Sequence, residues 1–196
     1  MKIYATLNPD YISNIYLVAD DENKFGIIIN PGSFAYNVYK LVQSAGVEIK
    51  GIIVTQNAKE CTDGIRLIKK IYDAKIYAYS PDIEDFKTVK VRDGFIIEES
   101  GITLKVLETP VNTFDSISIM SQDVVFVGNI MEAGTLSGFE EKDTPSDYEY
   151  QIIKNKILNI NDNLIIYPGK GPATTLEIEK KFNPYFKEIM GINNVG

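Results

Sequence analysis

Short apolar segments typical of buried strands recur through the chain, and each ends in a polar or glycine-containing loop. The first half contains KIYATL, NIYLVAD, GIIIN, IKGIIVT and KIYAYS. Between the last three, helical spacing of apolar residues predicts one helix from Ser33 to Gly46 and a second that starts at Thr62 or Asp63. The buried face of the second helix is predicted to consist of Ile65, Ile68, Ile71 and Tyr72.

The second half continues with shorter strands. Strands joined by turns are predicted over 81–113, and SISIMS and VVFVGN then lead to a loop over 128–145. NLIIYPG is the last predicted strand. The strands therefore fall into two blocks, which predicts two packed sheets.

Two further helices are predicted from capping boxes, in which a serine or threonine precedes a glutamate by three residues. One starts at Ser146, with Glu149, and the other at Thr174, with Glu177. Two blocks of strands, each flanked by helices, are typical of an α/β layered sandwich. The length of 196 residues predicts a single domain over 1–196.

The charge, the cysteine count and the length of the apolar runs limit which partners and which location the chain can have. A net charge of -7 disfavours nucleic acid, because phosphate binding needs a basic face, and it disfavours anionic membranes. One cysteine forms no internal disulfide, and no apolar run reaches the roughly 20 residues of a membrane span. We expect a cytoplasmic protein with no membrane association. The oligomeric state is left open.

The chain contains no histidine. Histidine is the commonest transition-metal ligand and the usual general base, and nucleophilic serine or cysteine usually depends on it. Any chemistry must therefore use carboxylate, lysine, tyrosine or cysteine side chains.

Four polar loops follow predicted strands, where ligands usually gather in such folds. They read TQNAKECTDG (55–64), ETPVNTFDS (108–116), FVGN (126–129) and YPGKGPATT (167–175). With NIYLV, IINPG and the extended segment YPGKGPATTLEIEKKFNPYF, they resemble the metallo-β-lactamase-fold hydrolases, especially the glyoxalase II-like branch, over almost the whole chain. The resemblance implies a four-layer αββα sandwich, in which two mixed β-sheets pack face to face with helices outside.

The resemblance also implies a dinuclear metal site whose ligands have been replaced in this sequence. In the family, the loop that corresponds to 55–64 reads Thr-His-x-His-x-Asp-His, and the loop that corresponds to 167–175 reads Pro-Gly-His-Gly. The histidine positions of the first metal carry Gln56, Ala58 and Asn112. The aspartate and histidine positions of the second metal carry Glu60, Cys61 and Lys170, Asn129 replaces the bridging aspartate, and Asn30 replaces an aspartate before Pro-Gly.

These replacements predict the loss of the metal. Zinc sites usually need three imidazole, thiolate or carboxylate ligands, and hard ions need several carboxylates. Only Glu60 and Cys61 remain as groups able to hold an atypical metal. We therefore expect no metal, no cofactor and no metal-activated hydroxide. Instead, Lys170 is predicted to form a buried ion pair with Glu60 and to donate to the Asn129 carbonyl, so that removing one charge costs about 3 to 5 kcal/mol.

Three functions follow as hypotheses. The first is a degenerate member of this fold that has lost metal-dependent hydrolysis and binds a small molecule or a protein through the former cleft. The second is a metal-independent hydrolase in which Cys61 is the nucleophile, assisted by Lys170 or Glu60, although Cys61 also fits a small buried residue. The third is a structural or oligomeric role.

Overall fold

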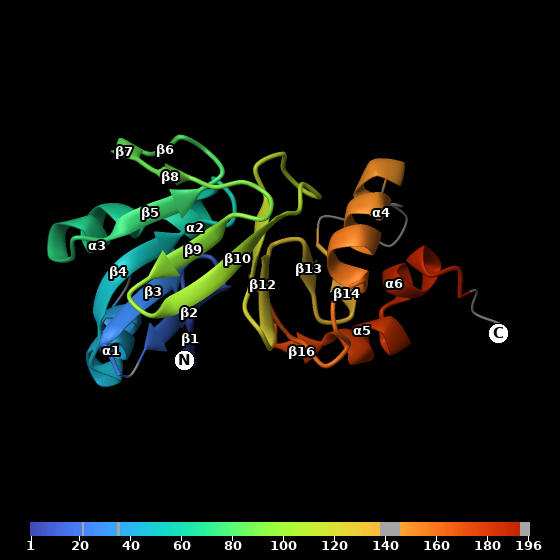
Figure 1. The fold of residues 1–196 in the computed structure, drawn as a ribbon, viewed down its shortest axis with the longest axis horizontal. Coiled ribbons are helices and arrows are strands. Elements are labelled where there is room, and N and C mark those ends of the chain that lie inside the picture. The colour runs from blue at the N-terminus through green and yellow to red at the C-terminus, as the bar shows by residue number, and fades with distance from the viewer. Residues whose placement is uncertain (21, 35, 138–145, 193–196) are drawn as a thin grey trace.

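Two six-stranded mixed sheets pack face to face, with helices on both outer faces (Figure 1). This computed structural model describes residues 1–20, 22–34, 36–137 and 146–192. The predicted four-layer αββα sandwich is confirmed. Among the described residues, none of the helices has the length and apolar character needed to cross a membrane.

The first sheet contains mainly the first half of the chain. Its strand order is β1 (Lys2–Asn8), β2 (Ser13–Asp20), β3 (Phe25–Ile29), β4 (Glu48–Ile53), β5 (Lys75–Ala78) and β8 (Val89–Lys90). Its first three strands pair antiparallel, and the pairs from β3 to β8 are parallel. Its helices are α1 (Tyr36–Ala45), α2 (Lys59–Thr62) and α3 (Ile65–Ile71), and a small hairpin is formed by β6 (Asp82–Ile83) and β7 (Phe86–Lys87).

The second sheet has the order β16 (Thr174–Thr175), β15 (Ile165–Pro168), β12 (Val124–Gly128), β11 (Ile117–Met120), β10 (Ile102–Glu108) and β9 (Ile96–Glu99). Its helices are α4 (Asp147–Ile153), the π-helix η1 (Lys154–Leu158), α5 (Leu176–Phe182) and α6 (Pro184–Ile189). The loop predicted over 128–145 contains a hairpin of β13 (Met131–Glu132) and β14 (Thr135–Leu136), and residues 138–145 lie outside the described part.

Successive side chains along the inner strands point to opposite faces of the sheet, which explains why these strands are apolar on both faces. Leu17 of β2 packs into the core beneath α1 and α3, whereas Tyr16 and Val18 pack between the two sheets. In β3, Ile28 faces the helices and Ile27 faces the other sheet. Because successive side chains point to opposite faces, a strand covered on both sides needs apolar residues at nearly every position.

The second predicted helix begins later than expected, and a separate short helix, α2, lies in the loop before it. The capping residue of the predicted helix was expected to be Thr62 or Asp63, but α3 starts after Gly64, which provides no side-chain cap. A Cβ at Gly64 would lie 2.6 Å from the Gly32 carbonyl oxygen, so close packing of the backbone determines this position. Ile71 was predicted to be buried and is 49% exposed, because α3 ends at that residue.

The two capping boxes had different outcomes. The Ser146 box is confirmed, since Ser146 N donates to Glu149 Oε2 at 2.8 Å and the Ser146 hydroxyl accepts from Glu149 N. The second predicted box does not form, and the helix is capped one residue later by a threonine alone. Thr174 pairs with the sheet in β16, and Thr175 caps α5 by accepting from Ile178 N.

Thr174 has another partner, the buried carboxylate of Glu179. Glu179 is 1% exposed and accepts hydrogen bonds from the Thr174 hydroxyl at 2.8 Å, the Asn183 amide at 2.8 Å and the backbone N–H of Gly134 at 3.0 Å. These bonds connect the β13–β14 hairpin, the last strand and the junction of α5 with α6.

Replacement of Glu179 tests this connection. Glu179→Ala leaves three donors without an acceptor, and we expect the free energy of unfolding to fall by about 2 to 4 kcal/mol. Glu177→Ala, on the exposed face of the same helix, is the matched control and should change it by less than about 0.5 kcal/mol. Urea denaturation measures both, and equal effects would contradict the structural role of Glu179.

Candidate functional site

Three of the four polar loops leave the same edge of the second sheet. Strands β12 and β15 are parallel, and β10 runs in the same direction because β11 is antiparallel to both of its neighbours. The loop after β4 comes from the first sheet and joins them, since Ile117 N donates to the Thr55 carbonyl at 2.8 Å and Asn57 N to Asp115 Oδ2 at 2.8 Å. The loops therefore converge although they are far apart in sequence.

One residue from each loop takes part in a continuous set of polar contacts. The Asn112 amide donates to the backbone carbonyl of Asn129, and the Asn129 amide donates to the Glu60 carboxylate. Lys170 Nζ lies 3.9 Å from Glu60 Oε1. We call Glu60, Asn112, Asn129 and Lys170 the four-loop cluster. The structure thus brings together four of the residues assigned to the former metal site.

Two glycines allow the loops to approach so closely. Gly128 has a φ of +58°, and a Cβ there would lie 2.6 Å from the Thr55 hydroxyl oxygen. A Cβ at Gly169 would lie 2.1 Å from Asn129 Oδ1. Any side chain at either position would force apart loops from different strands.

Asn30 fixes the beginning of the first loop. Its amide nitrogen donates to the Thr55 hydroxyl at 2.9 Å, and its Oδ1 accepts from Thr55 N at 2.9 Å. Asn30 is buried and has a φ of +52°, a backbone conformation that asparagine tolerates better than most residues. An amide suits this position because it donates and accepts at once, which an ionised aspartate cannot do.

The Pro-Gly-Lys-Gly turn that carries Lys170 is held by two residues of β2 that sequence reasoning missed. The Asn14 amide donates to the Pro168 carbonyl at 3.0 Å and the Gly171 carbonyl at 2.7 Å, and the Tyr16 hydroxyl donates to the Pro168 carbonyl at 2.6 Å. A polar residue inside the apolar segment NIYLV was the available signal. These bonds fix the turn independently of any bound ligand.

The pairing of Lys170 with Glu60 is present, but its surroundings differ from the prediction. The pair was expected to be buried, whereas the side chains of Lys170 and Glu60 are 40% and 23% exposed. Asn129 was expected to accept from Lys170 and instead donates to Glu60, because its amide nitrogen lies nearest the carboxylate. Water therefore reaches the ion pair and reduces its energetic weight.

Cys61 lies in the apolar core rather than in the cleft. It is 2% exposed and packs with the residues beneath α1 and α3. Burial, together with the negative charge of Glu60, raises the pKa of the Cys61 thiol to about 12. α2 has only four residues, so its N-terminus contributes little that would stabilise a thiolate. This geometry opposes the nucleophile hypothesis.

Gln56 and Ala58 lie in the first loop beside the cluster, and both are half-buried. The Ala58 N–H donates to the Gln56 carbonyl at 2.9 Å, which forms a tight local turn. Among the described residues, no hydrogen bond joins the Gln56 side chain to the four-loop cluster.

The donor set does not fit a catalytic metal. Within the described residues, no group of three or more histidine, cysteine, aspartate or glutamate side chains could hold a metal ion. Glu60 is the one carboxylate of the cluster, and it is shared by the Asn129 amide and the Lys170 ammonium. A metal would have to compete with a fixed positive charge for that ligand.

Comparison with known proteins agrees with the fold. No family model matches the chain. The sequence is 26% identical to hydroxyacylglutathione hydrolase GloC of Haemophilus influenzae, over 88% of this chain and 92% of that protein, and 25% identical to a probable metallo-hydrolase of Streptococcus pyogenes, over 95% and 90%.

Solved structures agree as well. ETHE1 from Myxococcus xanthus superposes with a TM-score of 0.83 at 20% identity, covering 100% of this chain and 92% of the other. A metallo-β-lactamase from Staphylococcus aureus superposes with a TM-score of 0.82 at 22% identity, covering 100% and 67%. The chain therefore has the metallo-β-lactamase fold. Its sequence resembles the glyoxalase II-like hydrolases.

Chemical labelling tests the placement of Cys61. Because the folded-state pKa is about 12, the thiol stays protonated and buried at pH 8, and iodoacetamide should not label the native protein. The same reagent should label the urea-unfolded chain completely, which serves as the control. Rapid labelling of native protein at pH 6 to 7 would contradict the structure and support a catalytic thiol. Mass spectrometry measures both.

Stability measurements test the exposed ion pair. Lys170→Met should lower the free energy of unfolding by less than about 1 kcal/mol, because a partly solvated pair contributes little. Lys154→Met, an exposed lysine of η1, is the control for removing a surface charge. If urea denaturation shows that Lys170→Met lowers the free energy of unfolding by about 3 kcal/mol or more, the pair behaves as a buried one, as first predicted.

Proposed function

We propose that this chain binds a small molecule or a protein partner through the four-loop cluster and has lost metal-dependent hydrolysis. The observation that carries the proposal is the set of contacts that the Asn129 amide and the Lys170 ammonium make with Glu60. The carboxylate available for a metal is compensated within the protein.

The chemistry of the replaced residues supports the loss of hydrolysis. The nucleophile of the related hydrolases is a metal-activated hydroxide, which needs ligands that hold the ion and leave one position open. Amide, methyl and ammonium groups at these positions do not provide such a set. Cys61 does not replace the missing nucleophile, because it is buried and its pKa is raised.

The arrangement of the cluster supports binding. Loops anchored at strand ends by hydrogen bonds, such as those of Asn30 and Asn14, hold their side chains in fixed positions before a ligand arrives. The exposed Asn112 amide and the partly exposed Lys170 ammonium offer hydrogen bonds and one positive charge. A reduced, cytoplasmic location belongs to the same proposal and is supported by the single cysteine.

Metal analysis and a hydrolysis assay test the proposal together. Protein purified from cells supplied with zinc, iron and manganese should contain each at far below one ion per chain. It should also hydrolyse a hydroxyacylglutathione thioester, the substrate class named for the Haemophilus influenzae relative, no faster than buffer. Stoichiometric metal, or hydrolysis that a chelator abolishes, would overturn the proposal.

Restoring histidine tests whether the replaced positions are the former ligands. The variant Gln56→His/Ala58→His/Asn112→His should bind zinc at least about tenfold more tightly than the wild type, because three convergent imidazoles form a zinc site. The matched control, Asn57→His/Lys59→His/Thr113→His, places the same number of histidines one residue away in the same loops. Isothermal titration compares the two, and equal affinities would show that these positions do not converge on one metal.

A further inference from the structure

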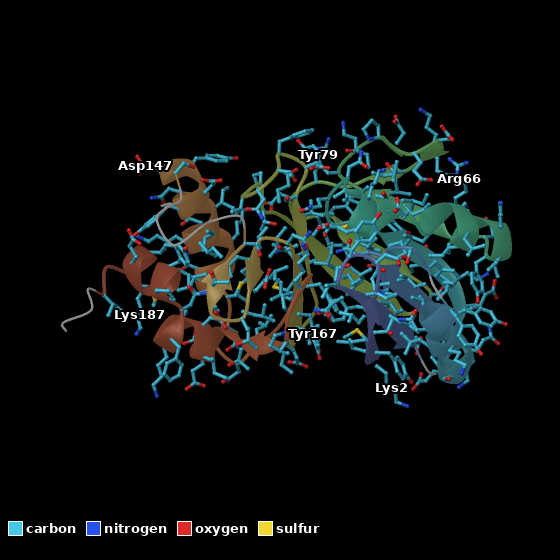
Figure 2. The ribbon with its side chains drawn as sticks, turned by 180° about the vertical axis from the view of Figure 1, so that it is seen from behind. Lys2, Arg66, Tyr79, Asp147, Tyr167 and Lys187 are labelled. Atoms are coloured by element: carbon cyan, nitrogen blue, oxygen red, sulfur yellow. The ribbon has the colours of Figure 1, made fainter. Side chains whose placement is uncertain are left out.

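A pocket of about 440 Å³ lies beside the four-loop cluster, between the loop after β10 and the first turn of α4. It includes Asn112 and therefore borders the cluster directly. In Figure 2, Tyr79 and Asp147 lie at the upper edge of the molecule, with Lys2 at the lower edge. The lining relevant here consists of Tyr79, Glu108, Val111, Phe114, Tyr148 and Glu149.

Aromatic rings from three separate elements line this pocket. Phe114 is 78% exposed and Tyr148 is 61% exposed, although both rings are large and apolar. Tyr79 meets Phe114 edge to face, with ring centroids 6.1 Å apart. Exposed aromatic side chains gathered around one cavity are typical of a binding site rather than of ordinary surface.

The charged groups of the pocket are acidic. Among the described residues, its lining contains Glu108 and Glu149 and no lysine or arginine. Glu149 Oε2 accepts from Ser146, and Oε1 has no hydrogen bond among the described residues. The chain as a whole carries a net charge of -7, so the potential around this pocket favours a cation.

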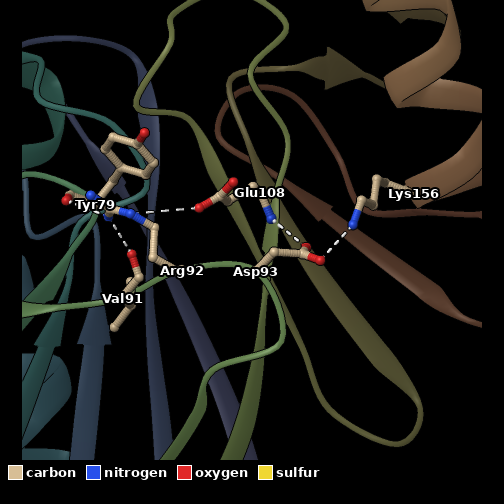
Figure 3. Close-up of polar contacts among 6 residues, drawn as sticks. All are labelled: Tyr79, Val91, Arg92, Asp93, Glu108 and Lys156. Carbon is tan, nitrogen blue, oxygen red and sulfur yellow. Dashed lines mark hydrogen bonds and ion pairs between the residues drawn. The ribbon is translucent and has the colours of Figure 1, made fainter.

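The guanidinium group of Arg92 already contacts two residues of the pocket lining, Tyr79 and Glu108 (Figure 3). The guanidinium carbon of Arg92 lies 3.7 Å from the centroid of the Tyr79 ring, and Arg92 Nε lies 3.8 Å from Glu108 Oε1. Its guanidinium also donates to the carbonyl oxygens of Tyr79 and Val91 at 2.7 and 2.6 Å. A positive charge is therefore held here by an aromatic face together with a carboxylate.

We infer that this pocket binds a small organic cation whose nitrogen carries apolar substituents. Phe114 and Tyr148 provide ring faces that attract the positive charge, Val111 contacts the apolar substituents, and Glu149 supplies a negative charge nearby. The volume is sufficient for a ligand of this size. The inference rests on the proposed binding function, because the pocket shares Asn112 with the four-loop cluster.

Titration with choline, compared with its neutral isostere 3,3-dimethylbutan-1-ol, tests the inference. Both have the same shape, and only choline is charged. Amide chemical shifts in NMR should move at residues of the pocket, and choline should bind at least about fivefold more tightly than the alcohol. Equal affinities, no binding of choline, or shifts confined to another surface would each overturn the inference.

Two variants test how much the aromatic rings contribute to choline binding. Phe114→Leu/Tyr148→Leu keeps the side chains apolar and should weaken choline binding at least about fivefold. Phe182→Leu, at a ring of α5 that is 63% exposed, is the matched control and should leave the affinity unchanged. Unchanged affinity in the double variant would also overturn the inference. Failure of the proposed function would appear separately, as bound metal or thioester hydrolysis.

Discussion

Burial of the inner strands on both faces is the constraint on which the rest of this structure depends. Residues such as Tyr16, Leu17 and Ile53 pack on one side or the other of a sheet, so little room is left for polar groups along the strands. Polar residues are therefore concentrated where strands end. The convergence of strand ends from both sheets makes those loops into a site, whatever residues they carry.

Polar side chains near the strand ends hold these loops in place. Asn30 connects β3 to the loop after β4, and Asn14 connects β2 to the turn after β15. Close contacts at Gly128 and Gly169 then bring the loops together. None of these residues is among the positions that the resemblance assigns to a metal site. The geometry of the loops therefore rests on contacts within the protein.

Within this framework Glu60 is the central residue of the four-loop cluster. A carboxylate near a metal is compensated by the ion, and here it is compensated by the Asn129 amide and the Lys170 ammonium. These side chains thus form one electrostatic unit where the loops converge. The aromatic pocket beside Asn112 has the opposite character, since its charges are acidic and its rings are exposed.

Much of the architecture could be predicted from the sequence, because apolar periodicity and capping boxes act locally. The Ser146 box is an example. Predictions failed where a distant segment decided the outcome. Thr174 joins a strand instead of starting a helix because β15 pairs with it, and α3 starts after Gly64, whose backbone packs closely on Gly32.

In the candidate site, too, some features could be predicted from the sequence and others depend on distant segments. The loops and their replaced residues could be identified by resemblance, and the contact of Lys170 with Glu60 followed from opposite charges at neighbouring positions. Three features of the site could not be predicted: the exposure of that pair, the partner of Asn129 and the burial of Cys61. Each depends on how segments from both sheets pack in space. The sequence by itself determined the layered fold and the absence of histidine, through local pattern and composition. Only the tertiary structure decided which side chains face water, which face one another and which are buried, because those relations join residues that are far apart in the chain.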